Sequence, residues 1–312
     1  NREYGKSLAV RVGAPESVVS RALKALSEKK LVVVSRNGKR NSVVVSDAPH
    51  AMALKALFAA RPYLDLRVLV HSSIRVLSGL LFPNASVARV KRVGFLPEIT
   101  VRRVLSKLLD AGVVGRRSSN DYFFLMPELE KAVSDYVSFA VMQAKQDASG
   151  SLIARGPIGF LRTSAASEGI PRFMKPTGLS VLNEFGVGVI QTDFKDYYYN
   201  VFGVVKKPAL ENVVVHVLLR STLSLSSREA SYALLALRKN WKTFDEEKFL
   251  MVASDLGVEF VARQSLDFVE NFENSLAGRE EAKPSIGVGF PRVEEPVFPS
   301  FEEFRELVKQ YG

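Results

Sequence analysis

One pattern of segments occurs twice in the chain, and this repeat limits the possible folds more than any other feature of the sequence. In the first copy, residues 6–12 predict a short helix, GAPES predicts a turn, and Ser17 to Lys30 predicts a second helix with Ser17 as its N-cap. LVVVS and SVVVS then predict a two-stranded hairpin around the basic tip RNGKRN. The second helix has one apolar face, formed by Val19, Ala22, Leu23 and Leu26.

The second copy has the same order. Residues 65–80, Ser86 to Val93 and Ile99 to Ala111 predict three helices, with a turn at 94–98, and GVVGRRSSNDYFFL predicts a shorter hairpin. The third helix again has an apolar face, formed by Val101, Val104, Leu105 and Leu108. With one extra residue in the second turn, Val19 aligns with Val101 and Arg21 with Arg103. The spacing between these aligned positions is too long for a solenoid repeat, so a duplicated domain is expected.

Helix, turn, helix and basic hairpin form the order of a winged helix-turn-helix domain. The expected fold class is therefore α+β: tandem winged helix-turn-helix domains followed by a mixed α+β domain with a small sheet. The first copy, through SLAVRVGAPESVVSRALKALSEKKLVVV, resembles the MarR-like winged helices of prokaryotic transcriptional regulators. This resemblance implies a DNA-binding fold, and that a helix preceding Lys6 lies wholly or partly outside the sequence.

The charge of the chain is concentrated in its first part. Residues 1–126 carry a net charge of +14 and residues 127–312 a net charge of −4. Clustered lysine and arginine side chains are what neutralisation of phosphates requires. The first part is therefore expected to bind a polyanion, although a solvated basic surface would have the same composition.

The expected ligand is double-stranded DNA, because a helix fits the major groove and arginine can form two bonds to guanine. The candidate contacts lie on the exposed side of the last helix of each copy and on the hairpins, where phosphate contacts are expected first. They are Ser17, Ser20, Arg21 and Lys24, then Thr100, Arg103 and Lys107, with Arg36, Lys39 and Arg40, and Arg116 and Arg117, on the hairpins. Winged helices also bind proteins, and the second copy, with its less polar hairpin, is the one expected to serve dimerisation or internal packing.

Five regions are expected along the chain. They are a first winged helix at 1–50, a second at 62–126, a linker helix at 127–148, an α+β partner or dimerisation domain at 150–277, and an extended arm with a C-terminal helix at 278–312. The linker helix, from Pro127 to Gln146, is expected either to pack on the second copy or to form a dimer surface.

The second half predicts a strand in YYYNVFGVV, and ENVVVHVLLRS fits either a helix or a buried strand. Further helices are expected in SSREASYALLALRKN, with a serine N-cap, from Asp245 to Leu256, with a stop at Gly257, and from Val258 to Leu276. The last helix is expected at 300–310.

Several kinds of chemistry are disfavoured. The chain has no cysteine and only three histidines, which excludes disulfides and thiolate zinc sites and nearly excludes histidine-based metal sites. Gly178, Ser180 and Asp193 have the order of a nucleotidyltransferase site. Lys195, however, stands where the second carboxylate would be, and Asp196 would point to the opposite face of a strand. No metal, no cofactor and no enzymatic activity are therefore expected.

His216 lies in an apolar run and is expected in the core. The sequence has no apolar run of membrane-spanning length and no signal peptide, so a cytoplasmic location is expected.

The stretch ALENVVVHVLLRSTLSLSSREASYALLALRKNWKTFDEEKFLMVASDLGVEFV resembles the C-terminal region of archaeal proteins related to the AbiEi antitoxins of type IV toxin-antitoxin systems. The shared features are the helix around His216, the helix from Tyr232 to Leu237 and the acidic start at Asp245. The resemblance implies an autorepressor that counteracts a nucleotidyltransferase-type toxin, although this chain has two winged helices where the family has one.

The sequence thus predicts a DNA-binding transcriptional regulator that is a homodimer and has a toxin-like protein partner for its C-terminal domain. The alternatives are a nucleic-acid-modifying transferase that uses Asp193 and Asp196, and a protein-interaction scaffold of the transcription or replication machinery.

Overall fold

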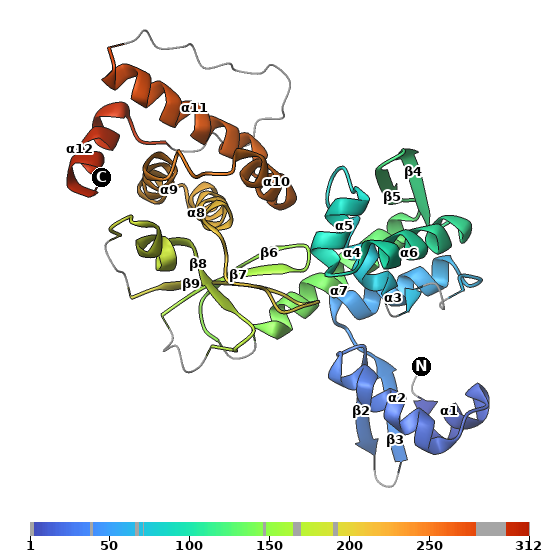
Figure 1. The fold of residues 1–312 in the computed structure, drawn as a ribbon. Coiled ribbons are helices and arrows are strands. Elements are labelled where there is room, and N and C mark those ends of the chain that lie inside the picture. Colours follow the sequence, from blue (N-terminus) through green and yellow to red (C-terminus); the bar gives the residue numbers. More distant parts are fainter. Residues whose placement is uncertain are drawn as a thin grey trace. The chain divides into compact units, whose positions relative to one another are not determined.

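The computed structural model describes residues 3–37, 40–65, 69–70, 72–145, 148–164, 170–189, 193–278 and 298–311; the side chains of 3–6, 36, 37, 40 and 41 are not described. The chain forms two compact units, Asn1–Ala144 and Lys145–Gly312 (Figure 1). Both units combine helices with small antiparallel sheets, which confirms the expected α+β class.

The first unit begins with a module of short elements, here called the first module. It contains β1 (Glu3–Tyr4), α1 (Gly5–Val12), α2 (Glu16–Glu28), β2 (Val32–Asn37) and β3 (Arg40–Val45). The strands form an antiparallel sheet in the order β1-β3-β2, so the expected hairpin is confirmed. The expected cap is wrong: Pro15, with its fixed φ of −56°, precedes the helix, and Ser17 lies inside it.

The second module contains α4 (Ser73–Gly79), α5 (Val87–Gly94), α6 (Glu98–Asp110), β4 (Val114–Ser118) and β5 (Asp121–Phe124). Ser86 caps α5 as its hydroxyl accepts a hydrogen bond from the Arg89 amide at 3.1 Å. The first helix is shorter than expected and begins after Ser72. Serine side chains compete for backbone hydrogen bonds, which favours a helix start here over a helix interior.

The two modules have equivalent backbone hydrogen bonds at the turn between their helices. The amides of Gly13 and Ala14 donate to Val10 and Ala9 in the first module. In the second module, the amides of Phe95 and Leu96 donate to Arg92 and Lys91. The turns therefore have equal lengths, and the extra residue expected in the second turn is wrong, because α5 extends to Gly94. Gly13 and Phe95 both have the left-handed conformation that ends a helix.

The apolar face is covered in one module only. In α6 the four apolar residues from Val101 to Leu108 are buried, because α4 packs on α5 and α6. In α2 only Val19 is buried, while Leu26 is 36% exposed. The expectation that Ala22, Leu23 and Leu26 are buried is therefore wrong, because Ala22 and Leu26 are exposed and Leu23 is half-buried. No helix among the described residues takes the place of α4 in the first module.

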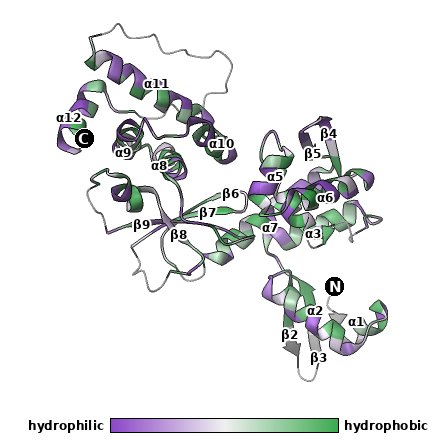
Figure 2. Cartoon of the chain, in the orientation of Figure 1, coloured by the Kyte–Doolittle hydropathy of each residue, from purple (hydrophilic) through white to green (hydrophobic). Residues whose placement is uncertain are grey.

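A helix follows the hairpin of each module: α3 (Pro49–Ala60) after the first and α7 (Pro127–Ala144) after the second. The α7 helix was expected, and it packs along α3 and contacts α4. No helix was expected at 49–60, because PHAMALKALFAA is apolar on most sides and has little helical periodicity (Figure 2).

The second unit has a four-stranded antiparallel sheet in the order β6-β7-β9-β8, formed by β6 (Ser151–Arg155), β7 (Ile158–Thr163), β8 (Lys175–Thr177) and β9 (Lys195–Asn200). The 3₁₀ helix η3 (Gly178–Phe185) joins β8 to the segment before β9. The helices are α8 (Leu210–Ser224), α9 (Ser227–Lys239), α10 (Glu246–Leu256), α11 (Glu259–Leu276) and α12 (Phe301–Tyr311).

Helix α8 lies at the centre of the hydrophobic core of the second unit. Every residue from Val213 to Leu219 is buried, so the segment that fitted either a helix or a strand is a helix surrounded by other elements. The expected caps Ser226, Asp245 and Gly257 are confirmed. The expected strand in YYYNVFGVV ends at Asn200. The expected arm lies largely outside the described residues, and the helix after it is confirmed.

Candidate nucleic-acid interface

One side of α2 presents a polar face. Ser17, Ser20, Arg21 and Lys24 are all exposed, while Val19 points inward. The Arg21 Nε donates to the carbonyl oxygen of Ser17 at 3.3 Å. This hydrogen bond holds the guanidinium of Arg21 next to the start of the helix. Backbone amides at a helix start also favour an anion. This part of α2 can therefore offer a guanidinium, an ammonium and two hydroxyls to one polyanionic surface.

The equivalent face of α6 differs from the sequence expectation. Arg103 is exposed at the position equivalent to Arg21. Thr100 is half-buried and corresponds to Val18, and Lys107 corresponds to Ala25, so these two lie outside the face defined by Ser17, Ser20, Arg21 and Lys24. Arg102 corresponds to Ser20 and is a further candidate. It is not among the contacts expected from the sequence, although the alignment of the two copies already pairs it with Ser20.

An acidic side chain moderates the charge of the α6 face. Glu98 accepts hydrogen bonds from Arg102 at 2.7 and 2.9 Å, and the Lys91 Nζ lies 3.9 Å from its other oxygen. The hydrogen bond from Arg102 lowers the pKa of Glu98 below its ordinary value, so the carboxylate is charged at neutral pH. Arg103 is therefore the cation of this face that forms no ion pair among the described residues.

Contacts within the hairpin of the second module fix the side chains of both its arginines, Arg116 and Arg117. Arg116 donates to the carbonyl oxygens of Ser118 at 2.8 Å and Ser119 at 2.5 Å, and Arg117 lies over the ring of Phe123 at 4.8 Å. Both side chains remain exposed. They can contact a phosphate from a fixed position, which lowers the entropy lost on binding.

The hairpin of the first module is described only in part. Arg36 lies on β2 opposite Asn41, and Arg40 lies on β3 opposite Asn37. Their side chains, and all of Lys39, lie outside the described residues.

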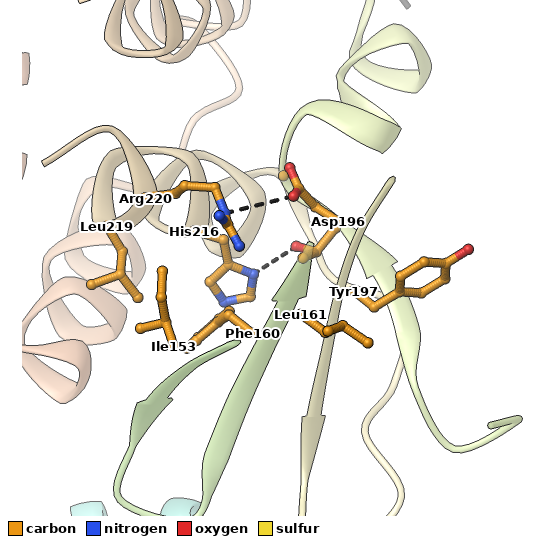
Figure 3. A pocket seen from close by; sticks show the side chains of 10 residues that line it. Ile153, Phe160, Leu161, Asp196, Tyr197, His216, Leu219 and Arg220 are labelled. Carbon is orange, nitrogen blue, oxygen red and sulfur yellow. Dashed lines mark hydrogen bonds and ion pairs between the residues drawn. The ribbon is translucent and has the colours of Figure 1, made fainter. Parts of the chain in front are cut away.

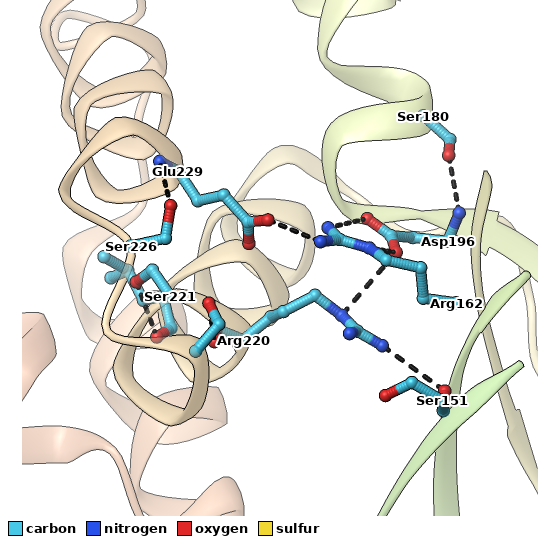
Figure 4. Close-up of polar contacts among 10 residues, drawn as sticks. Ser151, Arg162, Ser180, Asp196, Arg220, Ser221, Ser226 and Glu229 are labelled. Carbon is cyan, nitrogen blue, oxygen red and sulfur yellow. Dashed lines mark hydrogen bonds and ion pairs between the residues drawn. The ribbon is translucent and has the colours of Figure 1, made fainter. Parts of the chain in front are cut away.

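A buried charge cluster in the second unit surrounds Asp196, one of the two carboxylates of the transferase alternative (Figure 4). Arg162 donates to both carboxylate oxygens of Asp196, at 2.7 and 2.9 Å, and also to Glu229. The Arg220 Nε lies 3.6 Å from Asp196. The carboxylate of Asp196 is thus engaged by two guanidinium groups, while Asp193 is exposed.

Gly178 belongs to the same cluster. It has a φ of +58°, and a Cβ there would lie 2.9 Å from a carboxylate oxygen of Asp196. Ser180 accepts a hydrogen bond from the Asp196 amide at 2.7 Å. Gly178 and Ser180 therefore position Asp196 for its ion pairs, and among the residues that the structure describes no three His, Asp or Glu side chains form a metal-binding group.

A small cavity of about 10 Å³ lies beside this cluster, lined by residues that include His216, Thr177 and Phe160 (Figure 3). That volume is at the lower limit for one water molecule. His216 is buried, its Nδ1 lies 2.6 Å from the Thr177 hydroxyl, and the ring of Phe160 meets it edge-on. The prediction of a core histidine is confirmed.

We expect the second unit to lose stability as the pH falls below neutral. Burial lowers the pKa of His216 to about 3, against an ordinary value of 6.5. Between these values the unfolded chain binds a proton that the folded unit does not, so stability falls by up to about 1.4 kcal/mol per pH unit as pH decreases through this window. Urea unfolding at pH 7, 6, 5 and 4.5 measures the effect.

The matched variant is His216→Leu with Thr177→Val, which removes both partners of the hydrogen bond. Its stability should depend less on pH over the same range. Equal pH dependence of the two proteins would show that His216 does not resist protonation in the folded unit.

Searches against models of protein families and against curated proteins found no match to this chain. In the described parts of the chain, no helix has the length and apolarity needed to cross a membrane.

Proposed function

We propose that this chain is a DNA-binding transcriptional regulator whose first unit carries two winged helix-turn-helix modules. The observation that carries the proposal is the pair of helix, turn, helix and hairpin modules with matching backbone hydrogen bonds. In such modules the second helix of the turn enters the major groove. Both of these helices, α2 and α6, have an exposed arginine at the equivalent position.

The charge distribution supports a nucleic acid as the ligand. Residues 1–126 carry a net charge of +14, and the acidic excess lies in the remainder. Arg21 and Arg103 are assigned to base edges, with Ser17, Ser20 and Arg102 beside them. The hairpin arginines and Lys24 are assigned to phosphates, where they set affinity more than sequence preference.

The second unit is proposed to bind a protein partner or a second chain, and not to catalyse a reaction. Its ion-paired Asp196 supports this over the transferase alternative. The resemblance of its helices to AbiEi-related proteins suggests a toxin-like partner and repression of the chain's own operon, in the cytoplasm. Coexpression with the protein encoded next to it, followed by co-purification, tests this part separately.

The DNA-binding proposal is tested by the affinity of the purified chain for its own upstream duplex and for a scrambled duplex, from 50 to 300 mM salt. Release of counterions from phosphates should make both affinities fall steeply with salt. The upstream duplex should bind more tightly at every salt concentration. Absence of binding at low salt, or binding that salt does not affect, would favour the alternative of a protein-interaction scaffold.

A further inference from the structure

Helices α3 and α7, which follow the hairpins of the two modules, are related to each other by an approximate two-fold axis. The Arg61 Nη2 at the end of α3 lies 3.8 Å from Glu128 at the start of α7. His50, at the start of α3, stacks on Phe139 in α7 with a ring-centroid distance of 4.0 Å. The start of α3 therefore lies beside the C-terminal half of α7, and the end of α3 lies beside the start of α7, so the pair is antiparallel.

The backbone at the start of each helix defines which residues of the two helices correspond. The amides of Ala51 and Met52 donate to the Ala48 carbonyl oxygen. Those of Leu129 and Glu130 donate in the same way to the Met126 carbonyl oxygen, so Ala48 corresponds to Met126.

In this alignment His50 corresponds to Glu128, and Arg61 corresponds to Phe139. The contact between His50 and Phe139 is thus the symmetry mate of the contact between Glu128 and Arg61. A contact of i with j that is matched by one of j with i defines an isologous, two-fold interface, which normally joins two copies of a chain. Here the interface lies within a single chain.

Each helix is fixed to its module. The His50 Nε2 makes a 2.8 Å hydrogen bond with the Lys29 carbonyl oxygen at the end of α2. Helix α7 begins shortly after β5 and contacts both β5 and α4. The two helices pack on each other and both carry buried apolar residues, Leu57 in α3 and Leu129, Val133 and Val137 in α7.

We infer that one chain binds one duplex through two inverted half-sites, as a homodimer of single modules would. This inference rests on the proposed function. The helix pair places the modules in an inverted relation, and in two-fold symmetric proteins an inverted pair of modules matches an inverted pair of half-sites about one helical turn apart.

The two half-sites are expected to differ in sequence, because duplication has been followed by divergence of the two faces. Ser17 corresponds to Ile99, which is 79% exposed, and Ser20 corresponds to Arg102. An imperfect inverted repeat is therefore expected, in place of the perfect palindrome that identical modules would select.

The experiment selects duplexes from a random library with the full chain, and then measures the mass of the complex at several protein concentrations. The expected result is an imperfect inverted repeat bound by one chain per duplex at all concentrations. Arg21→Ala should relax sequence preference in one half-site only, and Arg103→Ala in the other. Arg228→Ala, at an exposed position in the second unit, is the control and should change neither.

The other outcomes are distinct. A direct repeat, a single half-site, or two chains that each occupy one half-site of the duplex would overturn the inference and leave the proposed function intact. If no duplex is selected even at low salt, both the proposed function and the inference are overturned.

Discussion

Replacement of Arg162 by methionine is expected to lower the free energy of unfolding of the second unit by about 3–5 kcal/mol. The guanidinium bridges Asp196 and Glu229, and the three side chains are only 10–19% exposed. Methionine fills a similar volume but leaves two carboxylates buried, with only the weaker contact of Arg220 at 3.6 Å. Urea unfolding followed by the fluorescence of Trp241, the one tryptophan of the sequence, reports on this unit.

Two further variants define the cause of that loss. Arg263→Met breaks an exposed ion pair with Glu259 in the same unit and should cost less than about 1 kcal/mol. Arg162→Met combined with Asp196→Asn and Glu229→Gln removes the unpaired charges and should recover part of the stability. A loss below about 1 kcal/mol for Arg162→Met alone would mean that water screens the cluster.

The second large effect is expected from the double replacement of Arg21 and Arg103 by alanine. Each arginine that grips a base contributes about 1–3 kcal/mol of discrimination, so the two together should reduce affinity for the specific duplex by at least about 30-fold. Affinity for a scrambled duplex should fall much less, because the hairpin cations remain. Fluorescence anisotropy with both duplexes at one salt concentration measures the difference.

The matched control for this variant is Arg228→Ala with Arg305→Ala, which removes the same charge from exposed positions of the second unit. It should leave discrimination unchanged. Since Arg21 and Arg103 are exposed, the double variant should unfold at the same urea concentration as the parent. Unaltered discrimination in the double variant would contradict the assignment of α2 and α6 as recognition helices.

Local rules predicted many of the elements. Ser86, Ser226 and Asp245 cap helices where a side-chain oxygen can reach a backbone amide in the first turn, and Gly257 ends a helix where a left-handed residue is needed. These signals act over a few residues, so the sequence contains them in full. The helix at 49–60 has no side-chain cap, and its apolar residues surround the axis, so its one local start signal is Pro49 at the first helical position.

The candidate interface was predictable in part. Repetition and charge indicated Arg21 and Arg103, which the structure places on the exposed sides of equivalent helices. Thr100 and Lys107 were chosen by residue type, and their positions on the helix were decided by the exact register between the modules. The alignment of Val19 with Val101 and of Arg21 with Arg103 already contained that register, and the backbone hydrogen bonds of the two turns agree with it.

The sequence by itself determined the repeated order of helices and hairpins, the α+β class and the concentration of positive charge in residues 1–126, since periodicity, capping and composition are properties of neighbouring residues. Only the tertiary structure decided that Arg162 pairs with Asp196 and Glu229, and that His50 meets Phe139 as Glu128 meets Arg61. Such contacts join residues far apart in the chain. They depend on how whole helices and strands pack, and no local pattern encodes that packing.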